Sequence, residues 1–396
     1  MKRSRSKSIS RLTPDAEKLV ALALGLTASG SLTEDRFWEN QLGKLVAHLL
    51  ESGHENSINV ALDHLFQAQS NAYETLIDQV ESLTVSATLK HGGKSSDVLM
   101  VAAPIVAWSK YRIASGPLNA DLALTLAAHL QAHVMAAGSR VALAPYLYSI
   151  DQLPRHFSDV RKLTIKLGEA ALHGVAPKLD LQRLPETAQL LSDARFLLAA
   201  VVAPQGEALF RWQEVGTAQH AGRTHCLEQW IAQGRPNLAP MFQGCVFEFL
   251  LPEAFYVSCR ESDRSVRPYS IRAAAAFLED ALKVNANHLC AIIAGFGADR
   301  IDEYRISLSL RGKDDVAHGI VWPLYGREDE STAPTPIEDI RTQLRECGIT
   351  EIEELKGIHP PEYCEDCGVP LFPTAEGEIV HAGLPEETDA PTAHFH

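Results

Sequence analysis

Hydrophobic positions recur at helical spacing through the first part of the chain. Between residues 13 and 83 apolar side chains return every three or four positions, with breaks near Gly30 and Gly53. Thr13 before Pro14 is typical of a helix start, because the threonine side chain can accept a backbone N–H and proline suits the first turn. The pattern predicts four short amphipathic helices packed as an antiparallel array.

The pattern then changes to short apolar runs typical of buried strands. Residues 98–108 are rich in β-branched side chains and predict a strand bent at Pro104. A helix over 118–137 and a second strand over 141–148 are expected to follow.

The order of strand, helix and strand recurs about 150 residues later. The corresponding segments are 245–256, 268–284 and 289–294. Pro252 takes the place of Pro104 in the first of them. The recurrence predicts an internal duplication that gives two similar strand–helix–strand lobes. Because few residues are identical, a chance likeness remains the alternative.

These elements predict an α+β protein with several parts. Further strands are expected over 196–203, 208–212, 304–310 and 319–325. Thr335, Pro336 and Glu338 form a capping box that predicts a last helix. The expected organisation is a disordered basic arm over 1–12, a helical segment over 13–90, a first α+β lobe over 91–190, a second over 191–326, an acidic linker over 327–334, and a C-terminal helix with a small zinc-ribbon-like tail over 335–396.

The composition limits which cellular compartment and which binding partners can be expected. The formal net charge of −14 repels phosphate backbones, so a broad nucleic-acid surface is not expected. Five Lys and Arg residues precede Asp15, and they predict either a solvated arm or a weak anionic contact. No secretory signal follows this basic start, and the longest apolar runs are shorter than the roughly 18 residues of a membrane span. We therefore expect a cytoplasmic protein without membrane contact.

The candidate chemistry lies near the C-terminus. Cys364 and Cys367 have the C-x-x-C spacing of half a tetrahedral zinc site, and His381 follows after a span that suits a small hairpin turning at Glu376-Gly377. The remaining cysteines are scattered, which is not the pattern of a disulfide framework. A structural zinc ion is therefore predicted. The fourth ligand would be His394, His396 or Cys347, and an unliganded turn with two free thiols remains the alternative.

Other motifs have simpler interpretations. His129 and His133 have the spacing of a zinc-binding helix but lack its glutamate, so packing is the favoured interpretation. The glycines of 295–299 favour a hairpin turn over a phosphate-binding loop. Glu248 is expected to face solvent by strand alternation.

Several short segments together resemble a known bacterial family over essentially the whole chain. They are Arg11-Leu-Thr-Pro-Asp-Ala16, Glu34-Asp-Arg-Phe-Trp38, Ala61-Leu-Asp-His-Leu-Phe66, residues 144–151, Phe210-Arg-Trp-Gln-Glu214, residues 363–372 and His394-Phe-His396. The family is called domain of unknown function 2863. The resemblance implies no reaction, substrate or catalytic residue.

Three functions remain as hypotheses. The first is a scaffold or regulatory protein that acts through protein contacts. The second is an enzyme whose site lies between the lobes, where Asp151, Arg155, Glu248 and Asp299 would converge. The third is nucleic-acid binding through the zinc tail and the basic arm, which the negative net charge disfavours.

Overall fold

The structure is a computed structural model that describes residues 12–325, 328 and 334–384. Nearly all of the expected basic arm and acidic linker lie outside the described residues, as do His394 and His396. Within the described part of the chain, no helix is both long and apolar enough to cross a membrane.

The N-terminal array forms where the periodicity predicts it. Its helices are α1 (Pro14–Thr27), α2 (Leu32–Ser52), α3 (Glu55–Gln67) and α4 (Ala72–Val85). The Thr13 hydroxyl accepts the N–H of Ala16, as a helix start requires. Gly53 ends α2 in the left-handed conformation, with φ of 75°. The apolar faces of all four helices meet in one core.

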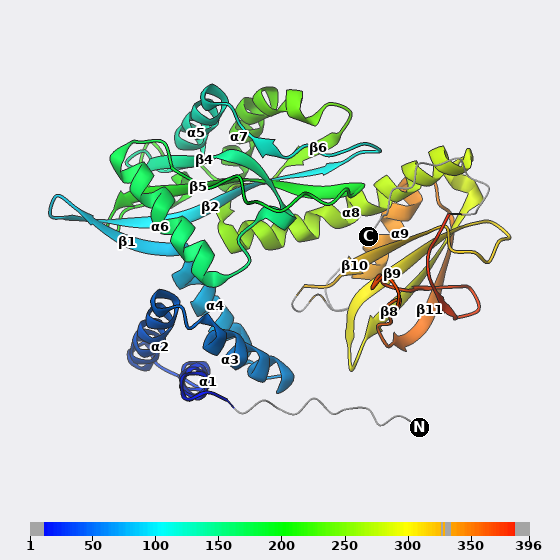
Figure 1. The fold of residues 1–396 in the computed structure, drawn as a ribbon, viewed down its shortest axis with the longest axis horizontal. Helices are drawn as coiled ribbons and strands as arrows, with labels where there is room; N and C mark the ends of the chain where they lie inside the picture. The colour runs from blue at the N-terminus through cyan, green and yellow to red at the C-terminus, as the bar shows by residue number, and fades with distance from the viewer. Residues whose placement is uncertain (1–11, 326–327, 329–333, 385–396) are drawn as a thin grey trace.

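A large antiparallel sheet follows the helical array and lies above it in Figure 1. Its strands are β1 (Ser86–His91), β2 (Lys94–Trp108), β3 (Gly116–Pro117), β4 (Arg140–Ser149), β5 (Ser192–Pro204), β6 (Val246–Phe249) and β7 (Glu253–Ala254). The order is β1-β2-β5-β4-β3, and β6 and β7 pair with the free side of β2. Pro104 lies inside β2, where it has no N–H to donate, but its carbonyl accepts from the N–H of Leu250 at 3.0 Å.

Helices cover both faces of this first sheet. Helices α5 (Ala120–His133) and α7 (Arg223–Leu238) pack on one face, and α6 (Phe157–His173) and α8 (Phe255–Leu282) pack on the other (Figure 1). Both sides of β2 and β5 are therefore apolar. Four short 3₁₀ turns complete this region and the next: η1 (Ile150–Gln152), η2 (Arg211–Gln213), η3 (Ala239–Phe242) and η4 (Ala286–His288).

Polar contacts attach the helical array to the first sheet and its helices. The carboxylate of Glu55 accepts the backbone N–H groups of Phe157 and Ser158, at 3.0 and 2.9 Å, in the first turn of α6. These N–H groups have no partner within their own helix, so Glu55 caps α6 from another element. Arg260 of α8 forms an ion pair with Glu81 of α4.

A second sheet follows α8. It contains β8 (Leu289–Gly297), β9 (Ile301–Leu310), β10 (His318–Pro323) and β11 (Glu351–His359), in the order β10-β9-β8-β11. Strand β11 runs parallel to β8. Helix α9 (Pro336–Glu346) begins with the predicted capping box of Thr335 and Glu338. Together α8 and α9 bury one face of the sheet.

The other face of the second sheet is covered by the tail segment, residues 360–384. It ends in a small hairpin of β12 (Phe372–Pro373) and β13 (Ile379–Val380). The ring of Phe372 lies so close to Gly319 of β10 that a Cβ added there would stand 2.3 Å from the ring. Glycine at 319 is therefore required for the tail to lie flat on the sheet.

The expected division into two lobes at residue 190 is wrong. Strand β5, assigned to the second lobe, lies between β2 and β4 of the first. Strand β6, the expected counterpart of β2, pairs with β2 in the same sheet, whereas β8 belongs to the other sheet. Because β5 is apolar on both faces, it needs a central position, and the first sheet supplies one. The internal duplication is not confirmed.

Two element boundaries also differ from expectation. The run 245–256 is a strand only over β6, and α8 begins at Phe255 and continues through Pro268. Residues 208–212 form no returning strand: Phe210 makes one isolated bridge with Met135, and a 3₁₀ turn follows.

Acid should destabilise the second sheet through His318 of β10. Burial lowers the pKa of this imidazole to about 4, whereas the unfolded chain takes up the proton near 6.5. Protons therefore favour the unfolded chain as the pH falls from 6.5 to about 4, and about 1 to 3 kcal/mol of stability should be lost in that interval. Denaturant titrations at several pH values measure the free energy of unfolding. In His318→Gln this free energy should fall less steeply as the pH is lowered. An unchanged pH slope would contradict this assignment, and His173→Gln, at an exposed position, is the control.

Candidate metal centre

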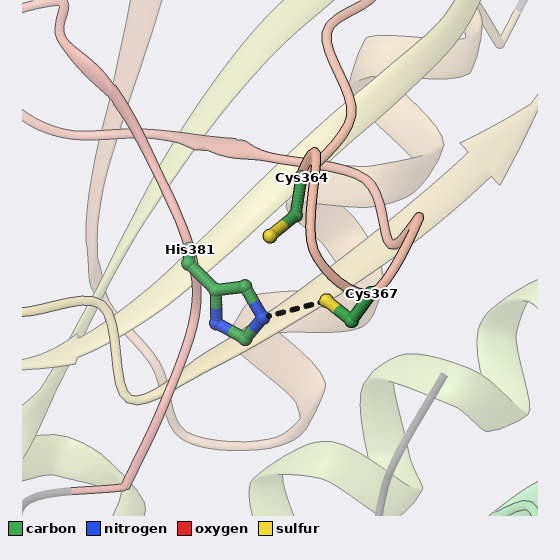
Figure 2. Close-up of side chains that lie close together, drawn as sticks. All are labelled: Cys364, Cys367 and His381. Carbon is green, nitrogen blue, oxygen red and sulfur yellow. Dashed lines mark hydrogen bonds between the residues drawn. The ribbon is translucent and has the colours of Figure 1, made fainter.

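The two cysteines of the tail lie at the ends of a tight turn. The N–H of Cys364 donates to the carbonyl of Val369 at 2.8 Å, and the N–H of Gly368 donates to the carbonyl of Cys364 at 2.9 Å. Gly368 has φ of 75°, in the left-handed region that glycine adopts without strain. The turn therefore brings both thiols to the same side of the chain (Figure 2).

The backbone of this turn prepares Cys364 to act as a ligand. The N–H groups of Cys367 and Asp366 point at its sulfur and lower the pKa of the thiol. Hydrogen bonds of this kind favour the thiolate, which is the form that binds a metal.

The hairpin brings His381 to the same point. Gly377, with φ of 83°, turns the chain between β12 and β13, and His381 follows β13 directly. Its Nε2 lies 3.4 Å from the sulfur of Cys367. One ligand atom from each of Cys364, Cys367 and His381 lies within 4.8 Å of the others (Figure 2). Among the described residues, no other group of three or more Cys, His, Asp or Glu side chains brings its ligand atoms this close together.

No described residue adds a fourth ligand atom to this group. Cys347 ends α9 and packs against the core of the second sheet, and burial raises the pKa of its thiol. The geometry therefore does not support Cys347 as a ligand. His394 and His396 lie outside the described residues.

A buried arginine under the turn was not identified from the sequence. Arg305 of β9 is fully buried, and its Nη1 donates to the carbonyls of Glu362 and Leu371, each at 2.7 Å. Its Nε donates to Glu303 at 2.7 Å. Arg305, Ser307 and Ser309 alternate with apolar residues in β9, and all three are buried. The tail contacts Arg305 and Ser307 on this face.

The other sequence motifs form no comparable centre. The rings of His129 and His133 stack with centroids 6.0 Å apart, and burial, with a smaller effect of His129, lowers the pKa of His133. Gly297 belongs to the β8–β9 hairpin, as predicted, and a Cβ added there would lie 1.8 Å from the carbonyl oxygen of Arg300.

The polar residues expected to converge on an enzyme site take part in separate contacts. Asp151 pairs with Arg155 at 3.7 Å, Glu248 accepts from the hydroxyl of Tyr269, and Asp299 accepts from Gln69 at 3.4 Å. An open groove of about 610 Å³ lies between the start of α5 and the end of α7, and none of these residues lines it.

Fold and site together define an α+β protein with a cysteine–histidine centre in its C-terminal tail. Residues 4–395 match the model of the family described as "Protein of unknown function (DUF2863)", and the chain belongs to this family. The resemblance found in the sequence is thereby confirmed. A search of curated proteins and a search of solved structures each returned no match.

Alkylation can test the electrostatics of the turn. At pH 7, iodoacetamide should label Cys364 of the metal-free protein well before Cys259, whose pKa burial raises to about 12. Mass spectrometry of the labelled peptides measures both rates, and unfolding the protein in urea should remove most of the difference. Equal rates in the folded protein would contradict a thiol activated by backbone N–H groups.

Proposed function

We propose that the tail binds one zinc ion through Cys364, Cys367 and His381, with His394 or His396 as the fourth ligand. The observation that carries this proposal is the approach of three ligand atoms to within 4.8 Å of one another from two separate segments of the tail. Two thiolates and an imidazole are donors that zinc accepts in tetrahedral geometry.

The role of the zinc ion in this proposal is structural. A fourth histidine would leave no open coordination position for a substrate. Most side chains of residues 360–368 are exposed, so the turn has little apolar core of its own. Zinc binding to such a site is worth on the order of 10 kcal/mol, which is enough to order a segment of this kind.

For the protein as a whole, we propose a cytoplasmic scaffold or regulatory protein that acts through protein contacts. The seven cysteines are free thiols, in keeping with a reducing compartment. Residues 12–85 contain eleven Asp and Glu against three Lys and Arg, so much of the negative charge lies on the helical array. The same array exposes Phe37 and Phe66, by 54% and 61%, and exposed aromatic side chains are typical anchors of protein interfaces.

The alternative of an enzyme has less support. Its candidate residues take part in separate ion pairs and hydrogen bonds, and the described residues place them in no common cluster with the geometry of a metal site. A nucleic-acid role would also have to overcome the negative charge of the array.

Metal analysis tests the zinc proposal. Untagged protein purified without chelators should contain about one zinc per chain, and Cys364→Ser should contain little, because loss of one thiolate breaks the tetrahedral set. Truncation after Pro391 removes His394 and His396 and should also lower the zinc content. Cys245→Ser is the control, since Cys245 packs with the core of the first sheet. Metal-free wild-type protein would refute the proposal.

A comparison of interaction partners tests the scaffold proposal. Phe37→Ser combined with Phe66→Ser should lose a partner that the wild-type chain retains, because both aromatic anchors are removed. The partner must then bind the purified wild-type chain with a measurable Kd that the double variant weakens at least tenfold. Leu124→Ser, at an equally exposed position on α5, is the control. Identical partners and affinities for all three proteins would contradict a role for this array.

A further inference from the structure

The contacts of Arg305 enclose the metal-binding turn from both sides. Glu362, whose carbonyl accepts one hydrogen bond, lies two residues before Cys364. Leu371, whose carbonyl accepts the other, lies four residues after Cys367. Both bonds come from the same nitrogen, Nη1, so one guanidinium closes the base of the turn.

Ser307 lies two residues after Arg305, on the same face of β9, and contacts the segment that carries His381. The hydroxyl of Ser307 donates to the carbonyl of Pro373. Pro373 pairs with Ile379 in the hairpin that is followed by His381. Arg305 and Ser307 therefore hold, on one strand, the two segments of the tail that supply the three ligands.

The surroundings of Arg305 indicate that its burial depends on the tail. Its carboxylate partner, Glu303, is still 21% exposed, whereas the Arg305 side chain is fully buried. The guanidinium lies over the rings of Phe296 and Tyr363, at 4.4 and 5.1 Å from their centroids. Two carbonyls and one ring of this environment come from the tail, and a buried cation without them would lose much of its compensation.

We propose that Arg305 is a positioning residue of the metal centre, and that metal binding and burial of Arg305 stabilise each other. The inference rests on the proposed metal site and adds the residue that sets its geometry. Arg305 holds the turn closed, so that Cys364 and Cys367 are already oriented when the metal arrives. In return, the metal cross-links the turn to His381 and keeps the tail over β9. Such coupling is reciprocal by thermodynamic necessity.

The test is a metal titration of the full chain with Zn²⁺ and with Co²⁺. The variants are Arg305→Lys, which keeps the charge but not the planar fork, Arg305→Met and Ser307→Ala. Each should bind about ten- to hundredfold more weakly than wild type, the range found when residues that support metal ligands are replaced. The visible spectrum of bound Co²⁺ should also change, because the sulfur ligands are held less closely to tetrahedral geometry.

Arg311→Met is the matched control. Arg311 lies just beyond β9 and pairs with Glu351 at 3.0 Å on an exposed surface, so its loss should leave the metal affinity unchanged. Arg305→Met removes a buried cation and leaves Glu303 unpaired, so it is the variant most prone to unfold. Ser307→Ala and Arg305→Lys keep the test valid in that case.

Three outcomes overturn the inference. If wild type binds metal and the Arg305 and Ser307 variants bind it equally well with the same Co²⁺ spectrum, Arg305 has no positioning role. If the variants lose the same stability with and without metal, at unchanged Kd, the role of Arg305 is only structural. If wild type binds no metal, the proposed metal site fails and the inference fails with it. Weaker binding and an altered spectrum, with normal behaviour of Arg311→Met, support it.

Discussion

The C-terminal part of the molecule depends on one buried cation that is bound by backbone carbonyls. Arg305 stands in the middle of β9, in a sheet whose opposite face is a conventional apolar core. A guanidinium in that position needs acceptors, and the tail supplies two. The turn of residues 360–368 in turn has mostly exposed side chains, and the hydrogen bonds of Arg305 hold it on the sheet. The two hydrogen bonds therefore serve both parts, although Nη2 of Arg305 is buried without a hydrogen-bond partner among the described residues.

The helical array is attached to the first sheet by the same kind of interaction. Glu55 binds two backbone N–H groups of α6, and Arg161 of α6 donates to the carbonyl of Leu83 near the end of α4 at 3.0 Å. In each case a charged side chain satisfies backbone groups that helix ends leave unpaired. Charged side chains therefore fix the relative positions of parts that are each built on their own apolar core.

The sequence predicts the locally determined elements well. Thr13-Pro14 and the capping box of Thr335 locate helix starts, because these residues bind backbone groups three positions away. The spacing of Cys364, Cys367 and His381 identifies a group that could hold a metal ion, and the hairpin brings its ligand atoms together. These predictions depend on contacts between close neighbours in the chain.

Long-range pairing could not be predicted in the same way. Strand β11 is rich in charged residues, such as Glu353 and Lys356, because it lies at a sheet edge with most of its side chains exposed, and its sequence has no strong strand pattern. The place of β5 depends on partners about 50 and 100 residues away. Arg305 shows only as the polar side of an alternation, which by itself indicates solvent and not a covering segment.

Helix α8 has a consequence for how the chain can be divided. Phe255 near its start belongs to the core of the first sheet, and Ile271 and Leu278 further along belong to the core of the second. A cut inside the helix would also divide contacts that cross over, because Arg267 lies over the ring of Trp322 in β10, whereas Tyr269, further along the helix, donates to Glu248 of β6. The two sheets are therefore not interchangeable modules. A fragment that contains only one sheet would need the whole of α8. The remaining sheet would then lack one of its covering helices, whether the fragment arose by recombination or was expressed on its own.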